Sequence, residues 1–140
     1  MNNSNNKKTH KRLLIVLLLA TITAGGVFMF SMLGKSQEER RNREYEVSLV
    51  NSLKNSYEGI EEIEISIPTY TNPPGDWSCK VEILFEDGKK IFYGIPHNLD
   101  EIENYNGRMT YGQRDFLNRR KGITTNTVTV TYSNKERGEQ

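Results

Sequence analysis

The sequence WSCKVEILFEDGKKIFYGI, residues 77–95, contains the pattern that decides the fold. Apolar and polar side chains alternate along its first part, which is typical of a strand with one buried face. Residues 86–89 (EDGK) form a typical hairpin turn, and residues 90–95 return as a second strand. We therefore predict a β-hairpin with one buried face. The predicted buried positions of its first strand are Trp77, Cys79, Val81, Ile83 and Phe85.

Two further strands are predicted, one on each side of this hairpin in the sequence. Residues 63–67 alternate isoleucine with polar side chains, and Pro68 ends the pattern. Residues 123–133 (ITTNTVTVTYS) are β-branched at nearly every position, as in many strands. With the hairpin, these segments predict an antiparallel sheet of about four strands. Residues 134–140 are polar and are expected to form a flexible tail.

Helical spacing appears before the first strand. Apolar side chains from residue 45 to residue 57 recur at intervals that place them on one face of a helix. Residues 34–44 are polar all round and are predicted to form a stalk, and a short helix is predicted around residues 111–120. A helix packed on one face of an antiparallel sheet gives an α+β domain over residues 45–133. This order resembles the cystatin-like or PepSY-like plan in architecture alone.

The N-terminal part of the chain has a different character. Residues 13–33 (LLIVLLLATITAGGVFMFSML) are 21 residues without a charged side chain, and about 20 apolar residues span a bilayer as a helix. We predict a single transmembrane helix that contacts the lipid bilayer. A cleaved secretory signal is the alternative, because residues 20–26 are small enough for a cleavage site. The apolar run continues beyond them, which favours an uncleaved anchor.

Charge indicates the orientation and excludes one class of partner. Equal numbers of basic residues flank the apolar run, but Lys11 and Arg12 adjoin it directly. We therefore predict that residues 1–12 are a cytoplasmic tail and that the domain lies outside the cell membrane. Residues 36–140 have a net charge of −4, which argues against nucleic-acid binding. A single cysteine excludes an internal disulfide.

No recognisable set of nucleophile, base or metal ligands appears, so we expect a binding domain without catalytic activity, metal or cofactor. Cys79 is expected to be buried, and His97 is expected in a surface turn. Aromatic residues near the turns and a group of arginines are typical of contact surfaces. Strand cores and solvated helix faces use the same residue types, so these alternatives stay open. The candidate contact residues are Tyr70, Trp77, Tyr93, Tyr105, Tyr111, Arg114, Arg119 and Arg120.

The motif Asn72-Pro73-Pro74-Gly75 precedes the alternating strand and the hairpin at residues 86–90. With the basic start and the apolar run, it resembles families of short membrane-anchored or exported Gram-positive proteins of unknown function. The resemblance implies a cell-membrane location and a fold type, and it supplies no catalytic residues. The expected partner is another envelope protein, a peptide or a wall polymer. An accessory subunit of a secretion or conjugation machine and an immunity protein are the alternatives.

Overall fold

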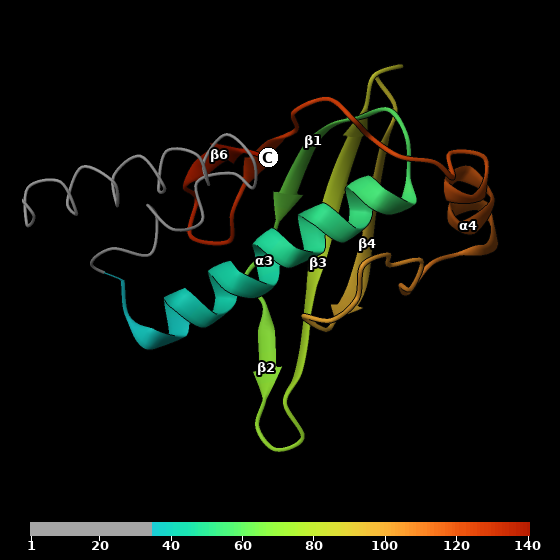
Figure 1. The fold of residues 1–140 in the computed structure, drawn as a ribbon. Coiled ribbons are helices and arrows are strands. Elements are labelled where there is room, and N and C mark those ends of the chain that lie inside the picture. The colour runs from blue at the N-terminus through green and yellow to red at the C-terminus, as the bar shows by residue number, and fades with distance from the viewer. Residues whose placement is uncertain (1–34) are drawn as a thin grey trace, which may run out of the picture.

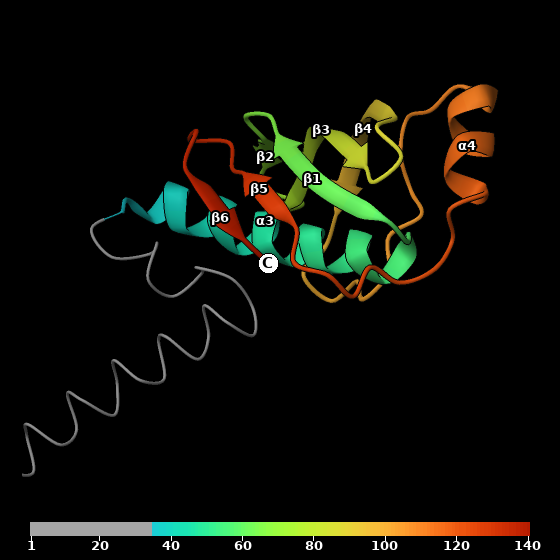
Figure 2. The same cartoon turned by 90° about the horizontal axis from the view of Figure 1, so that it is seen from above.

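The computed structural model describes residues 35–140, so the predicted transmembrane segment 13–33 lies outside the described part. Within residues 35–140, no helix combines the length and the apolar character that a membrane crossing requires. One long helix lies across a twisted sheet (Figure 1), and it covers only one of the two sheet faces (Figure 2). The elements in chain order are α3 (Gln37–Ser56), β1 (Ile60–Ile65), β2 (Thr69–Thr71), β3 (Asp76–Phe85), β4 (Lys90–His97), α4 (Tyr111–Asn118), β5 (Thr129–Thr131) and β6 (Arg137–Glu139).

Helix α3 confirms the helical spacing of the sequence. Ser36 caps its start, because the Ser36 hydroxyl oxygen accepts a hydrogen bond from the Glu39 backbone N–H at 3.2 Å. Leu49, Val50 and Leu53 are fully buried against the sheet. The apolar face of α3 therefore forms one side of the core, as an amphipathic helix on a sheet must.

The predicted stalk, residues 34–44, includes the first turns of α3, and one of its side chains is buried. Arg43 is only 1% exposed, and its guanidinium stacks on the Tyr132 ring at 3.8 Å. Its Nη2 donates to the Asn134 side-chain oxygen at 3.1 Å and to a Glu136 carboxylate oxygen at 3.2 Å. Arg43 thus binds residues about ninety positions later in the chain. Local sequence patterns do not reveal such a long-range contact.

Strand β3 is the centre of the sheet. Its first half pairs with β2 and its second half with β1, so β2 and β1 follow one another along the same edge of β3. The opposite edge pairs with β4 over the whole hairpin, from Leu84 with Lys90 to Trp77 with His97. All three pairings are antiparallel, and the hairpin predicted from residues 77–95 is confirmed.

The sheet as a whole is mixed and has six strands, so the prediction of a four-stranded antiparallel sheet is wrong in both respects. After α4 the chain passes the end of α3, where the Gly122 N–H donates to Ser56 O at 3.1 Å and the Thr124 N–H to Lys54 O at 2.7 Å. This long crossover brings β5 to the free edge of β1, where the two strands run parallel.

The last residues form a strand where the sequence suggested a flexible tail. Lys135 has a positive φ of 73° in the turn after β5, and the chain then returns as β6, antiparallel to β5. The Tyr132 hydroxyl donates to the Gln140 side-chain oxygen at 2.7 Å, and Lys54 Nζ donates to Gln140 O at 2.8 Å. These polar contacts compensate for the low apolar content of residues 134–140.

The alternation in β3 places its predicted apolar face in the core. Trp77, Cys79, Val81, Ile83 and Phe85 are all buried. Burial raises the pKa of the Cys79 thiol well above its usual range, so Cys79 behaves as a small apolar side chain. Ile67, in contrast, lies beyond the end of β1 and is 81% exposed, so its predicted burial is wrong.

Candidate functional site

Helix α4 is fixed to the outer edge of β4 by side chains at its start. Thr110 and Gln113 form a reciprocal capping box, with hydrogen bonds of 3.2 and 3.0 Å between side chain and backbone. The Gln113 side-chain amide also donates to Phe92 O at 2.8 Å, and Leu117 is buried. The predicted short helix is confirmed, and it stands at the end of the domain opposite to the start of α3 (Figure 1).

Five of the eight candidate contact residues gather around α4, and we call them the α4 surface. Tyr105 packs edge-on against Tyr57, with ring centroids 5.7 Å apart, at the end of α3. Arg114 Nη2 donates to Gly107 O at 3.4 Å, close to the loop that carries Tyr105. The α4 surface consists of Tyr105, Tyr111, Arg114, Arg119 and Arg120.

Residues of the α4 surface differ in their exposure and in whether another group of the domain binds them. Arg120 donates to the Asp87 carboxylate at 2.8 Å and lies over the Phe116 ring at 4.2 Å. The Arg120 hydrogen bond lowers the pKa of Asp87, so this ion pair holds α4 against the hairpin turn. Arg114 and Arg119 are exposed and form no ion pair within residues 35–140. Tyr111 is 93% exposed, so two guanidinium groups and one phenol ring of the α4 surface are exposed to solvent.

The other three candidate contact residues lie elsewhere. Trp77 is 1% exposed and stacks on Tyr45 at a centroid distance of 5.2 Å. Tyr93 is buried on the inner face of β4, and Tyr70 is half-buried beneath the guanidinium of Arg41 at 3.9 Å. Trp77 and Tyr93 therefore belong to the core, and the aromatic contact surface expected from the sequence is corrected to its Tyr105 and Tyr111 part.

His97 is buried, which corrects the expectation of a surface turn. It is the last residue of β4, and its exposed fraction is 1%. Its Nε2 lies 2.8 Å from the Ser48 hydroxyl oxygen on α3, and its Nδ1 lies 3.1 Å from the Asn104 side-chain nitrogen. Glu101 approaches Nδ1 at 3.6 Å. The period-two spacing of Ile91, Tyr93, Ile95 and His97 is the sequence signal that could have predicted this burial.

The hydrogen-bond partners of Asn104 determine the tautomer of His97. The Asn104 amide nitrogen donates to Pro96 O at 2.8 Å, and its side-chain oxygen accepts from the Asn106 N–H at 3.0 Å. The amide nitrogen therefore faces His97 Nδ1, which must accept, and the proton resides on Nε2. His97 donates to Ser48 in this arrangement and cannot take the proton of the Ser48 hydroxyl. Ser48 contacts His97, and His97 contacts Glu101, but because the proton is on Nε2 the three residues do not form an activated nucleophile.

Burial also shifts the titration of this cluster. Burial lowers the pKa of His97 to about 4, and the Asp100 carboxylate opposes that shift. Burial raises the pKa of Glu101, while a hydrogen bond from the Asn98 side chain lowers it. His97 is thus neutral at neutral pH and acts as a fixed hydrogen-bond bridge between α3 and β4.

Comparisons with known proteins give no relative from which a role can be transferred. No protein-family description matches the chain, and neither a curated protein nor a solved structure shows significant similarity to it. Within residues 35–140, no three histidine, cysteine, aspartate or glutamate side chains gather as metal ligands. The resemblance to exported Gram-positive proteins stays a prediction. A proposal about function must therefore rest on the chemistry of the exposed side chains of the domain.

Proposed function

We propose that this protein is anchored in the cell membrane through residues 13–33 and binds another envelope protein through the α4 surface of a domain outside the membrane. The observation that carries the proposal is the gathering of Tyr111, Arg114 and Arg119 on one exposed end of the domain. Tyrosine and arginine dominate the energetics of protein contacts, because each covers a large area and offers directed hydrogen bonds. Exposed guanidinium groups favour a partner surface that carries carboxylates.

The position of the α4 surface suits a tethered binding domain. Helix α3 begins at Gln37, four residues beyond the predicted membrane segment, and α4 lies near its other end. A helix of 20 residues measures about 30 Å in length. In the proposed arrangement the α4 surface therefore projects away from the bilayer. Tethering raises the effective concentration of such a surface toward neighbouring envelope proteins, so a modest intrinsic affinity is sufficient.

A binding role also agrees with the chemistry of the one serine and histidine pair at hydrogen-bond distance in the described domain. Because His97 donates to Ser48, the Ser48 oxygen is not activated for attack. Ser48 borders an open groove of about 410 Å³ beside α3, together with Leu99 and Ile102. These features support a proposed function in binding and supply no support for hydrolysis.

Site-specific crosslinking in native membranes tests the proposal. The full-length protein carries the photo-crosslinker p-benzoylphenylalanine in place of Tyr111, and a matched protein carries it in place of Arg40, which is exposed in the first turn of α3. We expect a discrete adduct from position 111 that disappears when Arg114→Glu and Arg119→Glu are added. Identical adducts from both positions, or an adduct insensitive to the two charge reversals, would contradict the proposal.

A second experiment separates the domain from the anchor. Residues 13–33 are replaced by an unrelated apolar segment of the same 21 residues. If the position-111 adduct persists, the domain alone selects the partner, as proposed. If it is lost while the protein remains in the membrane, the apolar helix selects the partner, which supports the alternative of an accessory subunit in a secretion or conjugation machine.

A further inference from the structure

The helix-free face of the sheet carries an elongated hollow of about 1160 Å³ near the end where β2 begins. No helix covers this face of the sheet in the described part of the chain (Figure 2). The hollow is distinct from the α4 surface, because none of the five residues of that surface lines it. Its lining includes Ser66, Ser78, Lys80, Gly94, Pro96 and Arg108.

Three of these residues form a row across the strands. Lys80 is directly opposite Gly94 in the β3–β4 ladder, and Gly94 pairs in turn with Arg108, whose N–H donates to Gly94 O at 2.8 Å. Residues directly opposite one another project from the same sheet face, and adjacent strands are about 4.8 Å apart. The Lys80 and Arg108 backbones are therefore about 10 Å apart by that spacing, with no side chain between them.

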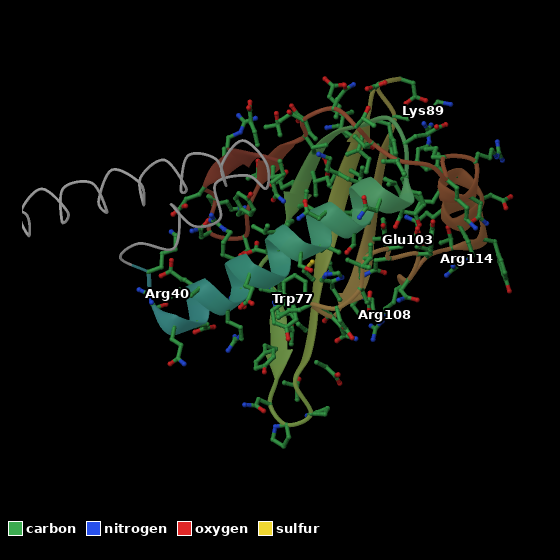
Figure 3. All side chains as sticks on the ribbon, viewed as in Figure 1. Arg40, Trp77, Lys89, Glu103, Arg108 and Arg114 are labelled. Carbon is green, nitrogen blue, oxygen red and sulfur yellow. The ribbon has the colours of Figure 1, made fainter. Side chains whose placement is uncertain are left out.

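Because Gly94 has no side chain, the space between the Lys80 and Arg108 side chains is open. A Cβ built on Gly94 would lie 4.0 Å from the Arg108 Cβ, which places both on the same face, and 3.9 Å from Cys79 O. Figure 3 shows Arg108 at the edge of the sheet beside β4, with Lys89 at the other end of the hairpin. An anion resting over Gly94 would thus meet side chains reaching from both sides.

Three of the residues that line the hollow are basic (Lys80, Arg108 and Lys135), and one, Asp76, is acidic. Glu82 pairs with Lys90 at 3.4 Å, and Glu64 lies 4.0 Å from Lys135. Lys80 and Arg108, in contrast, form no ion pair within residues 35–140. Asp76 is the carboxylate that lines the hollow.

A hydroxyl group completes the row on the β1 side. Ser66 accepts a hydrogen bond from the Lys80 N–H at 2.9 Å through its side-chain oxygen. The Ser66 backbone N–H donates to Lys80 O, also at 2.9 Å, so Ser66 continues the ladder beyond β1. Its hydroxyl proton is not used in this bond and can be donated to an acceptor oxygen.

We propose that this hollow binds the phosphate groups of a flexible polyanionic chain, with one phosphate over Gly94 between Lys80 and Arg108. Arginine and lysine donate charge-assisted hydrogen bonds to phosphate oxygens, and the guanidinium can do so through two N–H groups. The hollow is far larger than one phosphate group, which favours a chain over a single ion. Trp77, the aromatic residue of the lining, is 1% exposed, so the hollow itself offers no aromatic surface on which bases could stack.

Titration of the full-length protein with inorganic polyphosphate tests this inference by calorimetry. Lys80→Ala and Arg108→Ala are each expected to weaken binding about tenfold, and the double variant is expected to reduce the logarithmic salt dependence by about two. Gly94→Val keeps both charges and fills the open space between them, so it is also expected to weaken binding about tenfold. Lys89→Ala, which removes an exposed charge at the other end of the hairpin, is the control and is expected to bind unchanged.

Several outcomes would overturn the inference. They are an absence of polyphosphate binding, unchanged binding by the double variant, or unchanged binding by Gly94→Val. Equal binding of poly-glutamate would show that charge alone is sensed. Equal or tighter binding of a single-stranded oligonucleotide, or of vesicles that contain phosphatidylglycerol, would assign the basic row to a different partner. Circular dichroism of each variant establishes that the fold is retained, so that a loss of affinity reports on the hollow.

Discussion

Replacing His97 with phenylalanine is expected to remove a specific acid sensitivity from the domain. The imidazole is buried and bridges Ser48 to Asn104, while Glu101 and Asp100 are the charged groups that face it. Burial lowers the pKa of His97 to about 4, against 6.5 for the ordinary group. Between these pH values the unfolded chain binds a proton that the folded chain does not. Stability therefore falls as the pH falls.

The magnitude follows from the two pKa values. At pH 7 the imidazole is neutral in the folded state and mostly neutral in the unfolded state, so the histidine contributes little to the pH dependence there. At pH 4 the unfolded state is favoured by its bound proton, and the free energy of unfolding falls by about 3 kcal/mol relative to pH 7. The loss begins near pH 6.5 and continues to about pH 4. The phenylalanine variant has no titrating ring and should lack this component.

Urea unfolding at pH 7, 5.5 and 4 measures the effect, with the fluorescence of Trp77, the single tryptophan, as the probe. The stability of the wild type should fall by about 3 kcal/mol more than that of His97→Phe between pH 7 and pH 4. Glu101→Gln is the matched control for the neighbouring carboxylate, whose raised pKa acts in the opposite direction. Equal losses in the wild type and His97→Phe would refute the assigned burial of His97.

Three further substitutions or probes test other parts of the domain. Arg43→Ala removes a buried guanidinium from the Tyr132 ring and should lower the unfolding free energy by about 3 kcal/mol. Arg43→Met, which keeps a long side chain, should lower it less. Equal urea midpoints for the wild type and Arg43→Ala would contradict this packing. Gly107→Ala places a Cβ 2.7 Å from the Tyr93 ring at a φ of 150°, so the melting temperature should fall, and an unchanged value would count against this geometry. Cys79 should resist a thiol reagent in the folded protein and react after unfolding, and prompt labelling of folded protein would exclude its burial.

Short-range patterns in the sequence predict much of this fold. Period-two alternation predicts the β3–β4 hairpin, because its two strands are neighbours in the chain and one face must be buried. The spacing of Leu49, Val50 and Leu53 predicts α3 for the same reason. The parallel pairing of β5 with β1 has no local signal, since it depends on how the crossover after α4 packs past the end of α3. The number of strands and the mixed sheet follow from that long-range packing.

The candidate site shows the same division between local and distant information. Residue type and proximity in sequence identify Tyr111, Arg114 and Arg119, which lie on one short helix and at its C-cap. Two sequence signals disagree at Trp77: the period-two alternation predicts its burial, which is confirmed, whereas its place beside a turn suggested a contact residue. Local patterns do not predict the row of Lys80, Gly94 and Arg108, because Lys80 and Arg108 are distant in sequence and are brought together only by pairing on either side of Gly94.

The contacts between α3 and the last hairpin have a mechanical consequence for an anchored domain. Lys35 pairs with Glu136, Arg43 holds the same carboxylate, and Lys54 reaches Gln140. A pull on the segment before α3 would therefore also load Glu136, in the turn that leads into β6. Under the proposed anchoring, tension on the N-terminal side of the domain would be shared between α3 and the last hairpin.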